Sequence, residues 1–168
     1  MAMIMDAEAM HRSIRRIAHQ ILEQHQTLDK IMLLGIQTRG VFLAERIAKE
    51  LVAIDQVAVP VVSIDVKPFR DDLEVRPPVR LPNVSTQDLQ VILVDDVLYT
   101  GRTIRAAMDA VIALGRPLRI QCAVLIDRGH RELPVTANYI GKNVPSKRTE
   151  RVFVKLSEVD GVDSVELD

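Results

Sequence analysis

The chain has 168 residues, 48% of them hydrophobic and 27% charged, which are values typical of a globular protein and exclude a disordered chain. Its net charge of -1 excludes a generally basic nucleic-acid binder, so any such surface has to be a local patch. The single cysteine, Cys122, excludes an internal disulfide and favours a reducing compartment, the cytoplasm.

Targeting and membrane segments are not expected either. The first ten residues lack the basic region and apolar core of a secretion signal, and no segment is apolar over the roughly 18 residues of a membrane helix. We therefore expect neither export nor contact with a membrane. The length favours a single domain over residues 1–168.

The first part of the chain alternates helical and strand patterns. Apolar residues recur at helical spacing from Asp6 onwards, which predicts a helix with one buried face. The apolar run 31–36 predicts a buried strand, which is followed by a loop with the sequence QTRG at residues 37–40. After this loop a helical pattern resumes. Residues 57–66 are rich in β-branched side chains and predict another strand, with Pro60 at an edge or an irregularity.

A long segment without periodicity comes next. Residues 67–89, called the long loop below, contain four prolines. A stretch of this length in a compact domain predicts a lid or binding loop, and the alternative is a poorly ordered connector.

The second half repeats the order of strand, loop and helix. The run 91–94 predicts a strand that stops at two carboxylates, residues 100–115 predict a helix that stops at Gly115, and residues 119–127 predict a further buried strand. Continuous apolar strands that alternate with amphipathic helices predict an open α/β fold, in which helices cover both faces of a mostly parallel, twisted sheet. After Asp127 we expect short strands appended to this sheet.

Two sequences predict sites for anions. QTRG and DDVLYTGRT each follow a strand and lead into a helix, so both fall at the carboxyl edge of the sheet, where ligands of open α/β folds bind. Unpaired N–H groups and the dipole of a helix N-terminus favour an anion there. Thr100 and Thr103 can donate from their hydroxyls, and Gly101 allows a close approach of the backbone. Arg39 can supply a bidentate contact.

Asp95 and Asp96 lie beside the second of these anion sites. Carboxylates do not bind a phosphate, but they can accept hydrogen bonds from a sugar diol, help to hold a hydrated divalent cation and stabilise positive charge on a ribose carbon. The expected ligand is a phosphorylated sugar; the alternative is an acidic pair that caps a helix or ends a strand in water. Nucleotide sites of the GxxxxGK(S/T) and GxGxxG types are excluded because the chain contains neither sequence.

VILVDDVLYTGRT, residues 91–103, resembles the phosphoribosyl-pyrophosphate signature of the type I phosphoribosyltransferases. The chain is similar over nearly its whole length to one subgroup, the bacterial regulators of pyrimidine-operon attenuation that have uracil phosphoribosyltransferase activity. The sequences that carry this similarity are RIAH, GIQTRG, DDVLYTGRT, RAAMDA, LGRP, DRGHRELP and YIGKNVP. The resemblance implies the type I phosphoribosyltransferase fold with a lid loop.

The resemblance also implies a reaction, in which uracil and phosphoribosyl pyrophosphate give UMP and pyrophosphate. Mg²⁺ is then chelated mostly by the substrate near Asp95 and Asp96, with no direct protein ligand. The two aspartates would hold the ribose hydroxyls, and Thr38 and Arg39 the pyrophosphate. The implied catalytic residues are Asp95, Asp96, Arg39 and Arg70. The implied nucleotide-binding residues are Thr38, Arg39, Asp95, Asp96, Val97, Leu98, Tyr99, Thr100, Gly101, Arg102 and Thr103.

Further implied site residues lie in the long loop and near the C-terminal strands. Arg70, in the sequence RDD, would close over the pyrophosphate, assisted by Arg76 and Arg80 unless these two are solvated loop charges. Arg128 and Val152 would line the uracil pocket, although the pattern alone makes Val152 a core residue. The KPF that precedes RDD departs from the family, which puts the kinetics of the lid in doubt more than the chemistry.

The resemblance implies a second activity, the UMP-dependent binding of a stem-loop in the leader messenger RNA of the pyrimidine operon. The basic residues that would serve it are Arg12, Arg15, Arg16, His19, Arg131, Lys142, Lys147 and Arg148. A solvated basic helix face is the alternative reading of the same residues. The scarcity of aromatic residues favours recognition of a folded RNA through its backbone and loop. The family also implies a homo-oligomer, either a dimer or a tetramer.

Two other functions remain open at this point. An RNA-binding regulator could keep the nucleotide site only as a sensor of UMP, but the intact Thr38, Arg39 and Arg70 favour an enzyme, because a sensor needs no pyrophosphate clamp. A purine phosphoribosyltransferase is disfavoured only by the resemblance of DRGHRELP.

Overall fold

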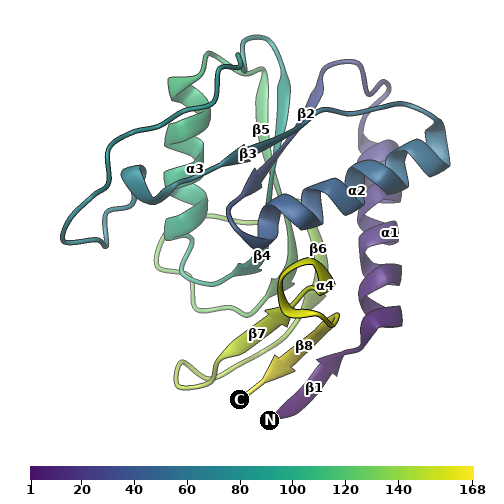
Figure 1. Ribbon diagram of the computed structural model, residues 1–168, viewed down its shortest axis with the longest axis vertical. Coiled ribbons are helices and arrows are strands. Elements are labelled where there is room, and N and C mark those ends of the chain that lie inside the picture. The colour runs from purple at the N-terminus through teal and green to yellow at the C-terminus, as the bar shows by residue number, and fades with distance from the viewer.

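The computed structural model describes all residues from 1 to 168 and contains a large sheet, a small sheet and four α-helices (Figure 1). In chain order the elements are β1 (Ala2–Met5), α1 (Ala7–Gln24), β2 (Ile31–Ile36), α2 (Arg39–Asp55), β3 (Val61–Ile64), the 3₁₀ helix η1 (Lys67–Phe69), β4 (Gln90–Leu98), α3 (Arg102–Ala113), β5 (Arg119–Asp127), β6 (Tyr139–Asn143), β7 (Val152–Lys155), α4 (Ser157–Asp160) and β8 (Ser164–Leu167). None of the helices has the length and the apolar character needed to cross a membrane.

The large sheet confirms the predicted parallel architecture. Its five strands are all parallel and follow the order β3-β2-β4-β5-β6. Every residue of β2 is buried, which explains the uninterrupted apolar run in its sequence. Pro60 directly precedes β3, which is an edge strand. Proline is tolerated at such a place because it has no N–H to donate within a sheet. The expectation that β4 stops at the two carboxylates was wrong: its pairing with β5 continues to Leu98, so Asp95 and Asp96 lie within the strand.

Helices cover both faces of the large sheet. On one face α1 and α2 bury a cluster of 24 apolar residues, which includes Ile14, Ile17 and Leu43. On the other face α3 and η1 cover a second cluster of 15, which includes Ile104 and Val111. The two clusters explain why both sides of the central strands are apolar.

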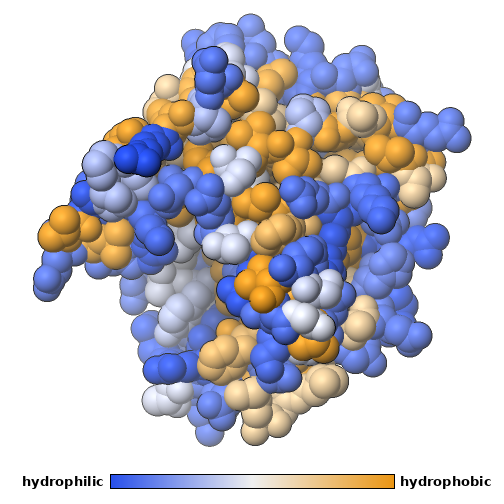
Figure 2. Space-filling view, in the orientation of Figure 1, coloured by the Kyte–Doolittle hydropathy of each residue, from blue (hydrophilic) through white to orange (hydrophobic).

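The sequence of α1 explains where the helix begins and how it packs. The carboxylate of Asp6 accepts a hydrogen bond from the N–H of Ala9 at 2.8 Å, which caps the first turn. The apolar stripe of the helix is buried: Met10, Ile14, Ile17, Ala18 and Ile21. The opposite side carries charged side chains, and Figure 2 shows a largely hydrophilic surface at the right of the view, where Figure 1 places this helix.

The last strands only partly follow the expectation that they extend the large sheet. β6 does extend it, in parallel with β5. β7 and β8 instead form a separate antiparallel sheet with β1, in the order β1-β8-β7. The sequence did not predict β1, because its partner β8 lies at the other end of the chain and no local pattern shows that pairing. The two termini therefore lie close together in Figure 1.

Gly40 allows the N-terminus of α2 to approach the large sheet closely. A Cβ atom at this position would lie 2.3 Å from the carbonyl oxygen of Val94 and 3.3 Å from the Cα of Asp95. No side chain other than hydrogen fits there without moving the backbone. The close approach brings the loop after β2 next to the acidic pair of β4.

Replacing Gly40 by alanine should therefore destabilise the protein. We expect Gly40→Ala to lower the free energy of unfolding by about 3 kcal/mol, because the new methyl group overlaps the backbone of β4. Urea denaturation measures the change. Gly129→Ala is the control: it meets no atom within 4 Å but has φ +81°, and should cost only about 1 kcal/mol for backbone strain. An equal or smaller loss for Gly40→Ala would contradict the close contact.

Candidate active site

Two loops share the carboxyl edge of the large sheet. The QTRG loop (residues 37–40) follows β2, and the YTGRT loop (residues 99–103) follows β4. Because β2 and β4 are adjacent and parallel, both loops emerge on the same side of the sheet. Their predicted proximity is confirmed.

The YTGRT loop presents free backbone donors. Four of its N–H groups form no hydrogen bond within the chain, namely those of Tyr99, Thr100, Gly101 and Thr103. Only the N–H of Arg102 has a partner, the hydroxyl of Thr100 at 3.3 Å. Gly101 has φ +94°, a left-handed conformation in which glycine is favoured. Clustered free N–H groups at the start of α3 form a site suited to an anion such as a phosphate.

The QTRG loop offers a second set of free donors. The N–H groups of Thr38, Arg39 and Gly40 form no hydrogen bond within the chain. Gln37 anchors the loop to β3, since its N–H donates to the carbonyl of Ile64 at 2.9 Å. The peptide bond between Gln37 and Thr38 is cis. Two sets of free N–H groups therefore lie at the same edge of the sheet.

The acidic pair lies between these two loops. One oxygen of Asp95 accepts the N–H of Asp96 at 2.9 Å, and one oxygen of Asp96 accepts the N–H of Val97 at 2.8 Å. Asp95 is only 8% exposed, and burial together with the charge of Asp96 raises the pKa of its carboxyl well above the usual range. The nearby arginines pair with other carboxylates, Arg39 with Asp160 and Arg70 with Asp72, and Asp96 is more exposed than Asp95. The alternative of a helix-capping pair does not hold, because both residues lie inside β4.

The start of the long loop docks on the N-terminus of α3. Arg70 donates to the hydroxyl of Thr103 at 2.8 Å and forms a bidentate pair with Asp72. This pair holds the pKa of the Asp72 carboxyl below its usual value. Asp71 binds the guanidinium of Arg102 at 2.9 Å. The RDD sequence thus lies next to the YTGRT loop, as a lid residue requires.

Other predicted residues are not directed at the two anion sites. The side chain of Arg39 turns to Asp160 of α4, with Nη2 2.9 Å from the carboxylate, and lowers the pKa of that carboxyl. Arg76 and Arg80 are exposed and form no ion pair or hydrogen bond. Sequence reasoning missed Asp160, because nothing near position 160 signals its partner.

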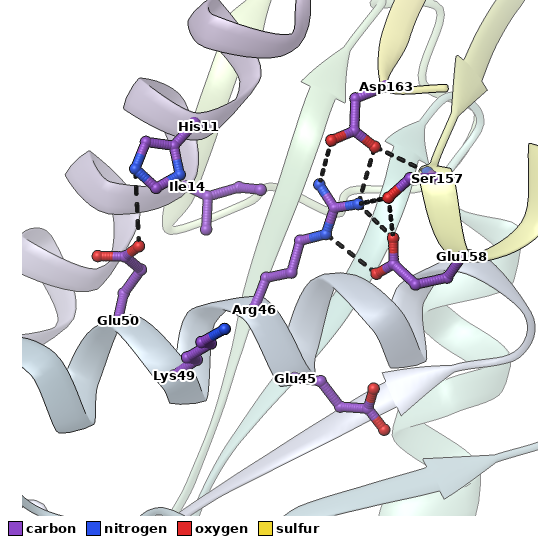
Figure 3. A pocket seen from close by; sticks show the side chains of 9 residues that line it. All are labelled: His11, Ile14, Glu45, Arg46, Lys49, Glu50, Ser157, Glu158 and Asp163. Carbon is purple, nitrogen blue, oxygen red and sulfur yellow. Dashed lines mark hydrogen bonds and ion pairs between the residues drawn. The ribbon is translucent and has the colours of Figure 1, made fainter. Parts of the chain in front are cut away.

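Arg46 ties the middle of α2 to the C-terminal segment (Figure 3). Its guanidinium lies between the carboxylates of Glu158 and Asp163, with 2.8 Å to Asp163, and also contacts Ser157. The arginine holds the pKa of both carboxyls below the usual range. The adjoining cleft of about 510 Å³ is therefore lined by charges that mostly satisfy one another, and it lies along α2 away from its N-terminus. We assign no ligand to it.

The side chain of Arg128 is bound by protein groups. It is 7% exposed and donates to Ser146, Lys147 and Glu150 at 2.7 to 3.1 Å. Its guanidinium also lies 4.1 Å above the ring of Tyr99, a cation–π distance. A recess of about 370 Å³ adjoins it, lined by Asp127, Arg128, Gly129, Arg131, Asn143, Val144 and Pro145. The recess lies beside Arg128, where a uracil pocket is predicted, and that role of Arg128 stays a prediction. Val152 is half-buried and packs against the core, as its pattern indicated.

The predicted RNA-binding residues fall into three groups. Arg15 and His19 are exposed on α1 without partners, and Lys147 is exposed after β6. Arg16 donates to the carbonyls of Ile140 and Gly141, and Lys142 to that of Ile4 at 3.4 Å, so α1 and β6 bring these two basic residues to adjacent positions. Arg131 points inward instead and is bonded to the YTGRT loop.

Comparison with known proteins agrees with this geometry. The family model of the phosphoribosyl transferase domain matches residues 1–155. The Bifunctional protein PyrR of Streptococcus suis is 51% identical over 162 residues, 96% of this chain and 94% of that protein. The protein of the same name from Streptococcus sanguinis is 50% identical over the same shares.

Solved structures show the same fold. A crystal structure of the hypoxanthine phosphoribosyltransferase of Trypanosoma cruzi aligns with a TM-score of 0.79 over 99% of this chain and 95% of that chain, at 16% identity. The hypoxanthine phosphoribosyltransferase of Staphylococcus aureus aligns with a TM-score of 0.78 over 98% and 90%, at 15% identity. At these identities the likeness establishes the fold alone.

The buried carboxyl of Asp95 makes stability depend on pH. A pKa that is raised in the folded state stabilises the fold below 3.8, the ordinary value, and this contribution is lost as the pH rises through the raised pKa. We expect Asp95→Asn, which keeps the acceptor for the N–H of Asp96, to be more stable than the parent by about 1–2 kcal/mol at pH 8, and by less at pH 5.

Urea denaturation across this pH range measures the difference. Asp109→Asn, on the exposed side of α3, is the control and should show no such trend. If the difference in stability between Asp95→Asn and the parent stays constant with pH, burial does not raise the pKa of the Asp95 carboxyl.

Proposed function

Because the chain belongs to the phosphoribosyl transferase family, we propose that it catalyses the transfer of a phosphoribosyl group to uracil and also acts as a regulator, as the bifunctional PyrR proteins do. The reaction converts uracil and phosphoribosyl pyrophosphate to UMP and pyrophosphate. The observation that carries this proposal is the position of Asp95 and Asp96 between two loops with free N–H groups. The choice of uracil rests on the 51% identity to a PyrR protein.

The substrate divides among the three parts of the site. The free N–H groups of the YTGRT loop, with the hydroxyls of Thr100 and Thr103, bind the 5′-phosphate. Asp95 and Asp96 accept hydrogen bonds from the ribose hydroxyls. The free N–H groups of the QTRG loop bind the pyrophosphate. This division explains why carboxylates stand beside a site for anions.

Two arginines exchange partners when the substrate binds. Arg39 leaves Asp160, and Arg70 leaves Asp72, so that both reach the pyrophosphate. Their side chains are 33% and 27% exposed, and partly exposed ion pairs contribute only about 1 kcal/mol or less. Breaking these two ion pairs therefore costs less free energy than charge-assisted hydrogen bonds to a pyrophosphate provide.

Catalysis consists of positioning and electrostatic stabilisation. The bond from the anomeric carbon to the pyrophosphate oxygen breaks as the uracil nitrogen forms a new bond to that carbon, and the proton of this nitrogen is released to water. The carboxylates of Asp95 and Asp96 stabilise the positive charge that develops on the ribose. The loops hold phosphate, ribose and base in line, which lowers the entropic part of the barrier. No nucleophilic side chain is required.

Mg²⁺ fits this site as a partner of the substrate. The chain has no group of three or more His, Cys, Asp or Glu side chains that could hold a metal ion by itself. Asp95 and Asp96 would accept hydrogen bonds from water molecules of a substrate-bound ion. When bound, Mg²⁺ offsets the negative charge of the leaving pyrophosphate.

The regulatory activity is UMP-dependent binding to the leader RNA of a pyrimidine operon, which favours attenuation. The exposed basic residues of α1, Arg15 and His19, together with Lys142 and Lys147, suit contacts to RNA phosphates. Arg16 contributes its charge from beside β6. The protein acts in the cytoplasm as a homo-oligomer.

Asp96 supplies the first test of the enzyme. We expect Asp96→Asn to lower the rate of UMP formation from uracil at least about a hundredfold, because it removes a negative charge beside the developing positive charge. The measurement is a UMP assay with hypoxanthine as the control base, and Asp109→Asn should keep the parental rate. Near-normal turnover by Asp96→Asn would contradict its role at the ribose. If the parent binds RNA in a UMP-dependent way without any turnover, the site is a sensor.

Arg15 supplies a test of the RNA surface. Arg15→Ala should weaken binding to leader RNA severalfold and lower the slope of log affinity against log salt by about 1, since one phosphate contact is lost. Filter binding at several salt concentrations measures both, and UMP formation should be unchanged. Arg116→Ala, an exposed arginine at the amino end of β5, is the matched control. A parallel loss of turnover would indicate misfolding.

A further inference from the structure

Arg131 has an unusual set of partners for a residue in a loop. Its Nη1 donates to the carbonyl oxygen of Tyr99 at 2.9 Å, its Nη2 to the carboxylate of Asp127 at 2.6 Å, and its Nε to the carbonyl oxygen of Val135 at 2.8 Å. The side chain is 23% exposed. The guanidinium thus joins the distant Tyr99 to two residues that each lie four positions from Arg131 in the chain.

Two of these partners belong to different parts of the proposed site. Tyr99 is the first residue of the YTGRT loop, where the 5′-phosphate binds. Asp127 ends β5 and lines the recess in which the base is expected. Arg131 therefore connects the wall of the base recess to the phosphate loop through one rigid, planar group.

Neighbouring contacts reinforce this connection. The N–H groups of Glu132 and Leu133 both donate to the carbonyl oxygen of Thr100, at 2.9 and 3.2 Å. The carboxylate of Glu132 pairs with Arg102 at 3.1 Å. The carbonyls of Tyr99 and Thr100 are thus held on the side of residues 131–133, while four of the five N–H groups of the loop remain free.

From these contacts we propose that Arg131 is a positioning residue, which fixes the spacing between the base recess and the phosphate loop so that both ends of one nucleotide bind at once. The inference rests on the proposed function of this site. A nucleoside monophosphate has a fixed distance between base and phosphate, and a preformed spacing removes the cost of ordering the two subsites at each binding event.

The test separates spacing from general stability. Arg131→Lys keeps the positive charge near Asp127, but a single ammonium group cannot span the three acceptors. The dissociation constants of UMP, ribose 5-phosphate and uridine are measured by calorimetry. We expect UMP binding to weaken about tenfold, whereas ribose 5-phosphate and uridine, which each need one subsite, change less than about twofold. The value of KM for phosphoribosyl pyrophosphate should change less than kcat/KM for uracil.

Arg46→Lys is the matched control. Arg46 is 22% exposed and bridges several acceptors, but it lies away from both loops. This variant should lower the melting temperature while leaving the ratio of UMP to ribose 5-phosphate affinity unchanged. Equal weakening of all three ligands by Arg131→Lys, or unchanged UMP binding, would overturn the positioning role. A parent protein that does not bind UMP at all would refute the proposed function itself, together with the role that depends on it.

Discussion

The site depends on one constraint, the close approach of the N-terminus of α2 to the carboxyl end of β4. Gly40 makes this approach possible, since any larger residue would meet the carbonyl of Val94. The adjacent, parallel arrangement of β2 and β4 then places the QTRG and YTGRT loops at one edge. The acidic pair of β4 lies between two sets of free N–H groups as a direct result. A ligand with two anionic ends and a central diol matches this order of groups.

Arginine side chains hold together the parts of the molecule that the sheets do not join. Arg46 fastens the C-terminal segment to α2, Arg128 fastens the segment 146–150 to the end of β5, and Arg131 fastens the YTGRT loop to Asp127. A guanidinium suits this task because its planar donors bind several acceptors at fixed angles. Two further arginines, Arg39 and Arg70, have carboxylate partners, which they exchange for the pyrophosphate in the proposed function. The same residue type therefore serves both fixed and exchangeable contacts.

Most of the large sheet was predictable from the sequence, because a strand buried on both faces is a continuous apolar run. The runs 31–36 and 119–127 match β2 and β5. The small sheet was not predictable, since β1 and β8 pair across almost the whole chain and each is only four residues long. The end of β4 was misjudged for a related reason: polar residues such as Asp95 usually end a strand, but here pairing with β5 continues past them.

For the candidate site, the sequence by itself determined the chemical groups and their order along the chain: hydroxyls and a glycine before a helix, two acids before them, and QTRG after an earlier strand. Local rules suffice for this, because strand ends and helix starts depend on neighbouring residues. Only the tertiary structure decided which protein groups the arginines bind. Arg128 and Arg131 are both exposed-looking loop arginines in the sequence DRGHRELP. In the structure, Arg128 donates to Ser146 and Arg131 to the carbonyl of Tyr99, and these acceptors come close only when the chain folds.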